Sequence, residues 1–254
     1  MAMDVAGFDK RAFAHDGRTR DVYSLGEGPA VLLMHELPGM TPQCIALARR
    51  VAERGFTVHM PLLFGSPGQS SSLLGFAQVC ISREFNLLAN NGASPVANWL
   101  RALCRDISAE QDERPIGVIG MCLTGGLVFS MLMEPCVKAP VTSQPAIPLG
   151  RSEAARRALG VPDSHVVNLA TRRNFRMLGL RFTQDAKCPR ERFETLRGKL
   201  NERFTATEIE SGPGKPFPGS AHSVLTYHDP SRPEIRAAIE QTIAFLDAEL
   251  ATGG

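Results

Sequence analysis

Continuous apolar runs alternate with amphipathic stretches along most of the chain. Residues 30–35 (AVLLMH) and 116–120 (IGVIG) carry few polar side chains, a pattern typical of strands that are buried on both faces of a sheet. Further short strands are expected at residues 56–60, 139–144, 177–182 and 205–209. Buried strands of this kind occur in parallel sheets, which are covered by helices on both sides.

Helices are expected between these strands. Thr41-Pro42 offers an N-cap hydroxyl followed by proline at the first helical position, and this helix should stop at Gly55. Ser94-Pro95 opens a second helix in the same way. Others are expected at residues 123–133, in two short pieces within 151–174 broken at 160–162, at 189–200, and from a Ser231/Glu234 capping box to about residue 250.

The amino-terminal part differs from the rest. Residues 8–23 predict a β-hairpin, because Asp16-Gly17 forms a turn signal between two short runs that contain strand-forming residues. The remainder alternates strand and helix with no repeat and no linker. We therefore expect a single α/β domain over residues 1–254, with a mostly parallel sheet of about eight strands and helices on both faces.

Composition narrows the function classes. The chain has 254 residues, of which 43% are hydrophobic, as in ordinary globular proteins. Its 28 Lys and Arg residues nearly balance its 26 Asp and Glu residues, so nucleic acid and anionic membranes are not expected partners. The longest apolar stretches are too short to cross a bilayer, and the first residues lack the apolar core of a signal peptide.

Six cysteines, none in a Cys-x-x-Cys pair and none with zinc-binding spacing, indicate free thiols in a reducing compartment. We expect a cytoplasmic protein, monomeric or weakly homo-oligomeric, whose cysteines are mostly small buried residues. The question is whether one of them has a special setting.

Chemically capable side chains follow four of the expected strands. In chain order they are a carboxylate, a thiol, a second carboxylate and an imidazole: Glu36, Cys122, Asp185 and His222. In open α/β sheets, functional groups gather on the loops beyond the carboxyl ends of the strands, so these four side chains are expected to meet.

Cys122 has the best local context. A strand, a sharp turn and a following helix would place it at a helix N-terminus, where backbone N–H groups and the helix dipole favour thiolate over thiol. The Leu123 N–H lies beside the sulfur and could hold an oxyanion. The alternative interpretation is a small residue in a tight strand-to-helix crossing, with Gly125 and Gly126 allowing close helix packing.

His222 could serve as the base for Cys122, with Asp185 fixing the imidazole tautomer. Nucleophile, acid, histidine is the chain order of the nucleophile-elbow fold. Each partner alone is open to a simpler interpretation, since a loop histidine is often a surface residue and an Asp after a strand is often a turn residue. The other histidines fit the last loop less well, and His228 comes closest to it.

Four blocks together resemble the dienelactone hydrolase family: HELPGM at 35–40, GMCLTGG at 120–126, RFTQD at 181–185 and AHSVLT at 221–226. The resemblance runs from about residue 31 to residue 246 and implies the α/β-hydrolase fold. It implies Cys122 as nucleophile, His222 as base, Asp185 as orienting acid and Glu36 as an extra carboxylate that contacts the resting thiol. Leu37 and Leu123 match the positions whose N–H groups form the oxyanion hole.

Two positions depart from the family pattern. Thr124 replaces the glycine that usually stands two residues after the nucleophile, so a larger side chain must fit against a neighbouring strand. Thr226 stands where the member acting on dienelactone has an arginine that helps hold a substrate carboxylate. Arg83 is the remaining candidate for that role, because a guanidinium binds a carboxylate in a bidentate way; alternatively, it is a solvated helix residue beside Glu84.

We therefore expect a cysteine-dependent hydrolase of small carboxylic esters or lactones that needs neither a metal nor an organic cofactor. Its partner would be a small-molecule substrate. The alternative, from a different class, is a non-catalytic ligand-binding or thiol-sensing protein on the same fold. A serine-type esterase fits less well, because no Gly-x-Ser-x-Gly motif follows a buried strand.

Overall fold

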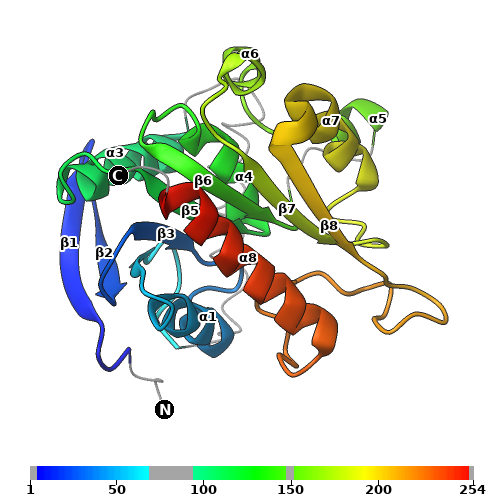
Figure 1. The fold of residues 1–254 in the computed structure, drawn as a ribbon, viewed down its shortest axis with the longest axis horizontal. Coiled ribbons are helices and arrows are strands. Elements are labelled where there is room, and N and C mark those ends of the chain that lie inside the picture. Colours follow the sequence, from blue (N-terminus) through cyan, green and yellow to red (C-terminus); the bar gives the residue numbers. More distant parts are fainter. Residues whose placement is uncertain (1–4, 69–93, 147–151, 252–254) are drawn as a thin grey trace.

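A computed structural model describes residues 5–68, 94–146 and 152–251. Within these residues, eight strands form one sheet in the order β1-β2-β4-β3-β5-β6-β7-β8 (Figure 1). The strands are β1 (Asp9–His15), β2 (Arg18–Leu25), β3 (Ala30–Met34), β4 (Thr57–Pro61), β5 (Ile116–Met121), β6 (Val137–Ser143), β7 (Met177–Phe182) and β8 (Phe204–Ile209). The predicted mostly parallel α/β architecture is confirmed.

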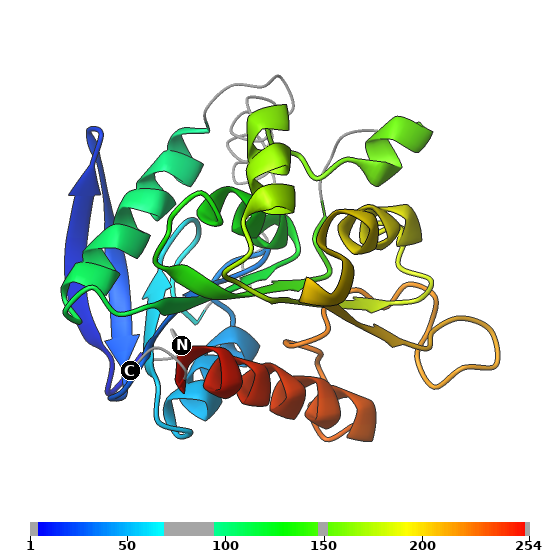
Figure 2. The ribbon, with the colours of Figure 1, turned by 45° about the horizontal axis from the view of Figure 1, so that its top comes forward.

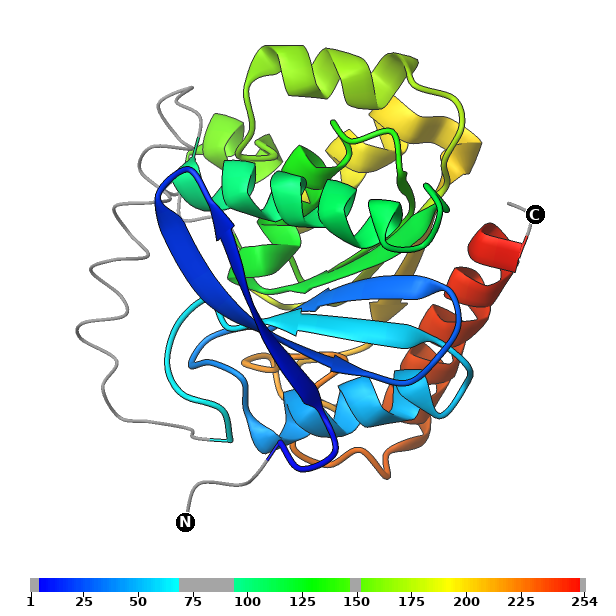
Figure 3. The same cartoon turned by 90° about the vertical axis from the view of Figure 1, so that its left-hand side faces the viewer.

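The expected amino-terminal hairpin is present. Strands β1 and β2 pair in antiparallel register, with His15 opposite Arg18 across the Asp16-Gly17 turn. Both turn residues have positive φ, 48° for Asp16 and 70° for Gly17, as a two-residue hairpin turn requires. β2 then joins the main sheet through antiparallel pairing with β4, so the hairpin extends one edge of the sheet (Figure 3).

All pairs from β4 to β8 are parallel. The helices between them are α1 (Pro42–Ala52), α3 (Pro95–Ala109), α4 (Leu123–Met131), α5 (Glu153–Arg157), α6 (Asp163–Thr171), α7 (Arg190–Leu200) and α8 (Pro233–Ala251), with a 3₁₀ turn at Asn201–Arg203. Figure 2 shows α1 and α8 on one face of the sheet and α3, α4, α6 and α7 on the other. Parallel strands need such crossovers, and the crossovers cover both faces.

Two apolar cores follow from this layering, one on each face. On β3, Leu32 and Met34 point into the core shared with α3, α4 and α7, whereas Val31 and Leu33 point into the core shared with α1 and α8. Successive side chains of a strand alternate between faces, so a five-residue apolar run fills both cores. This explains why the innermost strands carry almost no polar residues.

The helix-start signals were correct except at the last helix. Thr41 and Ser94 cap α1 and α3, their hydroxyl oxygens accepting hydrogen bonds from the N–H groups of Cys44 and Ala97, each at 3.3 Å. The predicted Ser231/Glu234 capping box is wrong. The Ser231 hydroxyl donates to the Asp229 carboxylate at 2.5 Å, and α8 begins two residues later at Pro233.

Membrane insertion through a helix has no support in the described residues, since none of their helices combines the length and the hydropathy that a bilayer span needs.

Candidate functional site

Cys122 occupies the sharp turn between β5 and α4. Its backbone has φ 55° and ψ −119°, a region that residues with a side chain rarely adopt and that costs about 1–3 kcal/mol. The turn is fixed on both sides: the Cys122 N–H donates to the Ser143 carbonyl at 3.0 Å, and the Cys122 carbonyl accepts from the Ala146 N–H at 2.9 Å. Such a strained strand-to-helix turn presents its side chain at the end of the sheet.

Glycines make room for this turn. A Cβ atom on Gly120 would lie 2.4 Å from the Thr124 carbonyl oxygen, and one on Gly125 would lie 2.9 Å from the Ser143 carbonyl oxygen. Both distances are shorter than a Cβ atom tolerates, so the close approach of α4 to β5 and β6 depends on glycine at these two positions.

Thr124 is accommodated through its hydroxyl. Its oxygen accepts a hydrogen bond from the Met121 N–H at 2.9 Å, and the hydroxyl lies 3.1 Å from the Met34 carbonyl oxygen and 2.9 Å from that of Met121, to one of which it donates. The side chain is buried. The expected contact with a neighbouring strand is therefore a polar link from the start of α4 to the end of β3.

The structure brings His222 and Asp185 together. Asp185 follows β7, and its Oδ2 accepts a hydrogen bond from the His222 Nδ1 at 2.7 Å. The other carboxylate oxygen, Oδ1, accepts from the Lys187 N–H at 2.9 Å, which fixes the orientation of the carboxylate. With its Nδ1–H used in this way, a neutral His222 has its lone pair on Nε2, where a base needs it.

The Nε2 of His222 faces Cys122 and Glu36. This nitrogen is buried and has no hydrogen-bond partner among the described residues. A ring nitrogen of His222 lies within 4.8 Å of the Cys122 Sγ and of a Glu36 carboxylate oxygen, and these two atoms lie within the same distance of each other. Burial lowers the pKa of His222, but the hydrogen bond that its Nδ1–H donates to Asp185 and the neighbouring Cys122 sulfur outweigh burial and raise that pKa to about 9.

Glu36 is a buried carboxylate whose hydrogen-bond donors among the described residues are all neutral. Its Oε2 accepts hydrogen bonds from the Ser223 hydroxyl at 2.8 Å and the Gln144 amide at 3.2 Å, and its Oε1 accepts one from the Thr226 hydroxyl. A glutamate at the end of a strand could instead be bonded to the backbone or to the neighbouring histidine. The His35 ring contacts the backbone carbonyl of Glu36, at 3.2 Å, and not its carboxylate in the described structure.

Gln144 and Ser223 belong to this cluster and were not expected there. Gln144 follows β6, is fully buried and has a positive φ of 35°. Its Oε1 accepts from the Val224 N–H at 3.2 Å and from the Ser143 hydroxyl, while its amide donates to Glu36. It thus connects the end of β6 with Glu36 and with the loop that carries His222. Its position directly after a buried strand was the available signal.

The other predicted site residues are Leu37, Leu123, Thr226 and Arg83. Leu37 follows the end of β3, and Leu123 is the first residue of α4, directly after Cys122; β3 and β5 are neighbours in the sheet. Thr226 is buried with its hydroxyl on Glu36, so this position supplies no cation. Arg83 and Cys80 lie outside the described residues.

The competing histidines are engaged elsewhere. The Nε2 of His35 accepts the Leu63 N–H at 3.0 Å, and burial lowers the His35 pKa to about 4. His59 is held by the Ser24 hydroxyl at 2.9 Å, with its pKa likewise lowered by burial to about 4. His228 stacks on the Tyr227 ring, with centroids 4.3 Å apart. None of these three is bonded to a carboxylate in the described structure as His222 is.

The other described cysteines lie in surroundings that disfavour the thiolate form. Cys44, Cys104 and Cys188 are buried, as predicted. Burial raises the pKa of Cys44 and Cys104 far above the ordinary thiol value and that of Cys188 to about 12. The half-buried Cys136 also has a raised pKa, mainly because of burial. Since the thiolate is the nucleophile, these four thiols are poor candidates for covalent chemistry.

The cluster of Glu36, Cys122 and His222 has a second chemical capability. A carboxylate oxygen, a sulfur and an imidazole nitrogen within 4.8 Å of one another could also receive a divalent ion such as zinc. The arrangement itself resembles a nucleophile with a base and an orienting acid, in which no metal participates. A bound divalent ion and metal-free nucleophilic catalysis can be distinguished by the effect of a chelator on activity.

A family model and several solved structures each match nearly the whole chain. The family model described as "Dienelactone hydrolase family" matches residues 19–248. Among solved structures, a protein of Klebsiella pneumoniae subsp. pneumoniae MGH 78578, provisionally named a dienelactone hydrolase, superposes with a TM-score of 0.64 at 20% identity over 96% of this chain and 98% of that one. No curated protein is similar enough in sequence to be matched to this chain.

Two further solved structures come from metagenomic libraries. A dienelactone hydrolase-like promiscuous phosphotriesterase, P91, has a TM-score of 0.64 at 14% identity, covering 96% of this chain and 98% of that one. A cold-adapted esterase from an Arctic intertidal library has a TM-score of 0.62 at 16% identity, with 95% of each chain covered. At such identities these two likenesses establish a shared fold.

Proposed function

Because this chain belongs to the dienelactone hydrolase family, we propose that it hydrolyses small carboxylic esters or lactones with Cys122 as nucleophile, His222 as base and Asp185 as orienting acid. The observation that carries this proposal is the His222 Nδ1–Asp185 Oδ2 hydrogen bond of 2.7 Å. The other imidazole nitrogen is buried and has no hydrogen-bond partner among the described residues, and the ring lies close to the Cys122 sulfur. The strained backbone of Cys122 adds to it, because strain of this kind concentrates at functional sites.

The proposed reaction has two halves. In the first, the Cys122 thiol passes its proton to the His222 Nε2, the sulfur adds to the substrate carbonyl, and the N–H groups of Leu37 and Leu123 stabilise the tetrahedral oxyanion. The imidazolium of His222 then protonates the departing alkoxide, leaving an acyl thioester. In the second half, His222 takes a proton from water, which attacks the thioester, and the acid leaves as Cys122 is restored.

Turnover of a short-chain chromogenic ester by single variants tests this assignment. Cys122→Ala should abolish turnover while leaving the circular dichroism spectrum unchanged. His222→Ala should lower kcat by at least ~10², the lower end of general acid–base contributions, and Asp185→Asn by a similar order or more. His228→Ala is the matched control and should retain activity. Full activity in His222→Ala would reassign the base.

The same assay separates hydrolysis from the other possibilities. Steady release beyond one equivalent of product supports an enzyme, whereas a single acylation equivalent with no further release would mean a thiol sensor. Prior dialysis against a chelator should leave the rate unchanged, because the proposed groups need no metal. A rate that falls on chelation and recovers with zinc would contradict the metal-free mechanism.

We further propose that the enzyme prefers neutral or weakly anionic substrates and acts in the cytoplasm. With a threonine at position 226, bonded to Glu36, one candidate cation for a substrate carboxylate is absent. We expect a higher kcat/KM for an uncharged ester than for dienelactone of similar size. A strong preference for the anionic lactone in the unmodified protein would refute this, and its loss in Arg83→Ala would assign the carboxylate contact to Arg83.

A further inference from the structure

One buried arginine lies between two segments that hold the candidate active site. Arg192, in the first turn of α7, has a buried side chain. Its guanidinium donates four hydrogen bonds among the described residues, and all four acceptors are backbone carbonyl oxygens. The donors of a guanidinium point in fixed directions within one plane, so the segments that carry their acceptors are held in fixed relative positions.

A single nitrogen of Arg192 joins the two segments. Its Nη1 donates to the Pro145 carbonyl oxygen at 2.8 Å and to the Lys187 carbonyl oxygen at 3.3 Å. Pro145 follows the end of β6, and Lys187 lies in the loop between β7 and α7. Because this nitrogen carries two hydrogens, it binds both oxygens at once and fixes the distance between the turn after β6 and the loop after β7.

On the β6 side, the contact supports the Cys122 turn through one peptide unit. The Pro145 carbonyl and the Ala146 N–H belong to the same planar peptide bond. The carbonyl accepts from Arg192, and the N–H donates to the Cys122 carbonyl at 2.9 Å. A strained backbone such as that of Cys122 persists only where surrounding bonds hold it, and this peptide unit supplies one of those bonds.

On the β7 side, the contact supports the acid of the proposed triad. The Lys187 N–H donates to the Asp185 Oδ1 at 2.9 Å, and the Asp185 Oδ2 accepts from the His222 Nδ1 at 2.7 Å. Arg192 holds the carbonyl group of this same Lys187. The guanidinium is therefore linked to Cys122 through one peptide unit and to the His222–Asp185 pair through one residue.

We propose that Arg192 is a positioning residue, which aligns Cys122 with His222 by fixing the turn after β6 against the loop after β7. This inference rests on the proposed function, because it gives Arg192 a part in the same reaction. The effect passes through backbone groups and not through contact with the substrate. Placement matters at this scale, since a misplacement of about 1 Å can lower an enzymatic rate by ~10²-fold.

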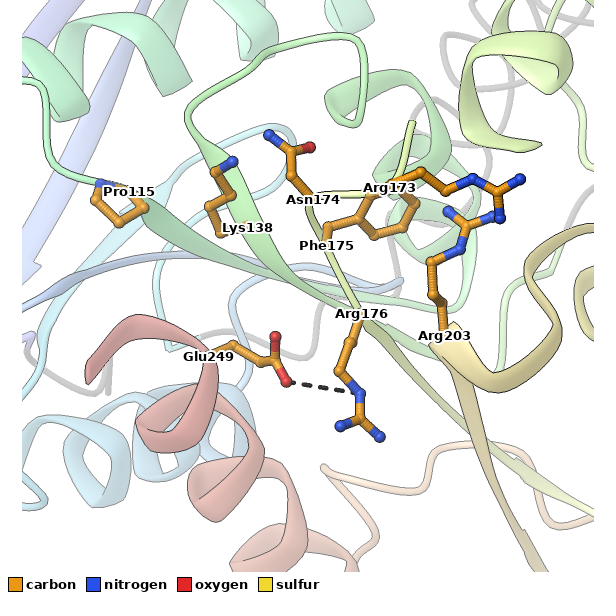
Figure 4. A pocket seen from close by; sticks show the side chains of 8 residues that line it. All are labelled: Pro115, Lys138, Arg173, Asn174, Phe175, Arg176, Arg203 and Glu249. Carbon is orange, nitrogen blue, oxygen red and sulfur yellow. Dashed lines mark ion pairs between the residues drawn. The ribbon is translucent and has the colours of Figure 1, made fainter. Parts of the chain in front are cut away.

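Arg203 provides a matched control at the opposite end of the sheet. Arg192 is 2% and Arg203 8% exposed, and each donates to four backbone carbonyl oxygens. Arg203 lies directly before β8, beside a cavity at the amino ends of the strands (Figure 4). Its acceptors lie in α6, just after α6 and in α7, away from the segments that hold the candidate site. A loss of stability should therefore follow from changing either arginine, and an effect on the site only from changing Arg192.

Arg192→Lys tests the proposal, because lysine keeps the positive charge and loses the planar fork that reaches several carbonyl groups. We expect kcat for a short-chain ester to fall about ten- to a hundredfold, with KM nearly unchanged. Arg203→Lys should retain the kcat of the unmodified protein. An unchanged kcat in Arg192→Lys, or an equal fall in both variants, would overturn the proposal.

The pKa of His222 is a readout that a loss of stability alone does not move. It is followed by the NMR signal of the imidazole in buffer containing a chelator, with His222→Gln used to assign the signal. In Arg192→Lys, a displaced Asp185 weakens the hydrogen bond from Nδ1–H, so the pKa of His222 should fall from about 9 toward 6.5. Arg203→Lys should show the pKa of the unmodified protein. An unchanged pKa in Arg192→Lys would contradict the proposed role.

Arg192→Met provides the same test if Arg192→Lys does not fold, because an apolar side chain leaves no buried charge without partners. The charge of Arg192 interacts with Asp185, and removing a nearby cation would by itself raise the pKa of His222. A fall in that pKa therefore reports lost positioning, and a rise or no change would refute it.

The NMR measurement needs no substrate, so it separates this inference from the proposed function. If the protein hydrolyses no ester but the pKa of His222 falls in the Arg192 variants, the proposed function fails and the positioning role stands. If ester turnover is confirmed and the Arg192 variants retain both kcat and the pKa of His222, the positioning role fails and the proposed function stands.

Discussion

At the scale of single residues, the site depends on how each ionisable group is held. Glu36 is buried within 4.8 Å of the Cys122 sulfur and of a His222 ring nitrogen, and the hydrogen-bond donors to its carboxylate among the described residues are neutral. Charges in a buried site act strongly on their neighbours, so a protonated His222 favours negative charge on the sulfur and the Glu36 carboxylate opposes it. We propose that substrate binding changes the partners of Glu36 and removes this opposition.

Replacing Glu36 tests how its charge affects the Cys122 sulfur. Glu36→Gln removes the negative charge and keeps the shape, so the pH profile of Cys122 alkylation by iodoacetamide should move to lower pH. Peptide mapping after brief labelling measures the rate at each pH. Glu53→Gln, at an exposed position, is the control. An unchanged profile in Glu36→Gln would remove Glu36 from the mechanism.

At the scale of secondary-structure elements, the start of α4 is held to the sheet by one hydroxyl. The Thr124 hydroxyl accepts from the Met121 N–H and donates to one of two carbonyl oxygens, that of Met34 at the end of β3 or that of Met121 at the end of β5. Glycine at this position would avoid a side chain, whereas threonine adds hydrogen bonds inside the turn. The elbow therefore combines close packing at Gly120 and Gly125 with polar links at Thr124.

We predict that Thr124→Val destabilises the protein by about 1–3 kcal/mol, because it leaves the Met121 N–H buried and unpaired. Thr124→Ser keeps the hydroxyl, loses one methyl group and should cost only about 1 kcal/mol. Urea unfolding of both variants measures which of the two is more stable. If the valine variant proves at least as stable as the serine variant, the hydroxyl is not what holds α4 to the sheet.

The elements were predictable from sequence where burial alone determines them. The run of residues 177–182 matches β7 residue for residue, since a strand buried on both faces leaves an apolar signal that only Arg181 interrupts. The start of α8 was misjudged because Ser231 has a nearer partner in Asp229. Local capping signals cannot reveal such competition, because a serine hydroxyl bonds equally well to a side chain or to a helix N–H.

The candidate site was predictable only in part. Each of the four groups following a strand could be named because parallel strands end at one edge of the sheet. Gln144 was missed because its role arises from contacts with Glu36 and Val224, which lie 108 and 80 positions away from it in sequence, respectively. No local pattern carries that information. Only the three-dimensional arrangement shows that a neutral amide connects the two loops.

At the scale of the whole molecule, the site links pH to stability. The pKa of His222 is raised from 6.5 to about 9 in the folded protein. A group whose pKa is higher when folded stabilises the fold fully below its unfolded pKa, and this stabilisation is lost as the pH rises through its folded pKa. His222 should therefore contribute stability below about pH 6.5 that disappears as the pH passes 9.

We predict that the unmodified protein and His222→Gln differ in how their free energy of unfolding changes with pH. Between these two pH values, the free energy of unfolding of the unmodified protein should fall by about 1–3 kcal/mol more than that of His222→Gln. Urea denaturation across the range measures both curves, and the subtraction cancels the other titrating groups. Parallel curves would mean that the His222–Asp185 pair is not protonated in the folded state.

The central claim is that Cys122 carries the acyl group during turnover. The most direct measurement is mass spectrometry of peptides after the protein is mixed with excess short-chain ester and quenched in acid, before the thioester hydrolyses. The account predicts that the acyl mass is found on the peptide containing Cys122 and is missing from the corresponding peptide of Cys122→Ala. An acyl group on another residue, or turnover that continues in Cys122→Ala, would contradict it.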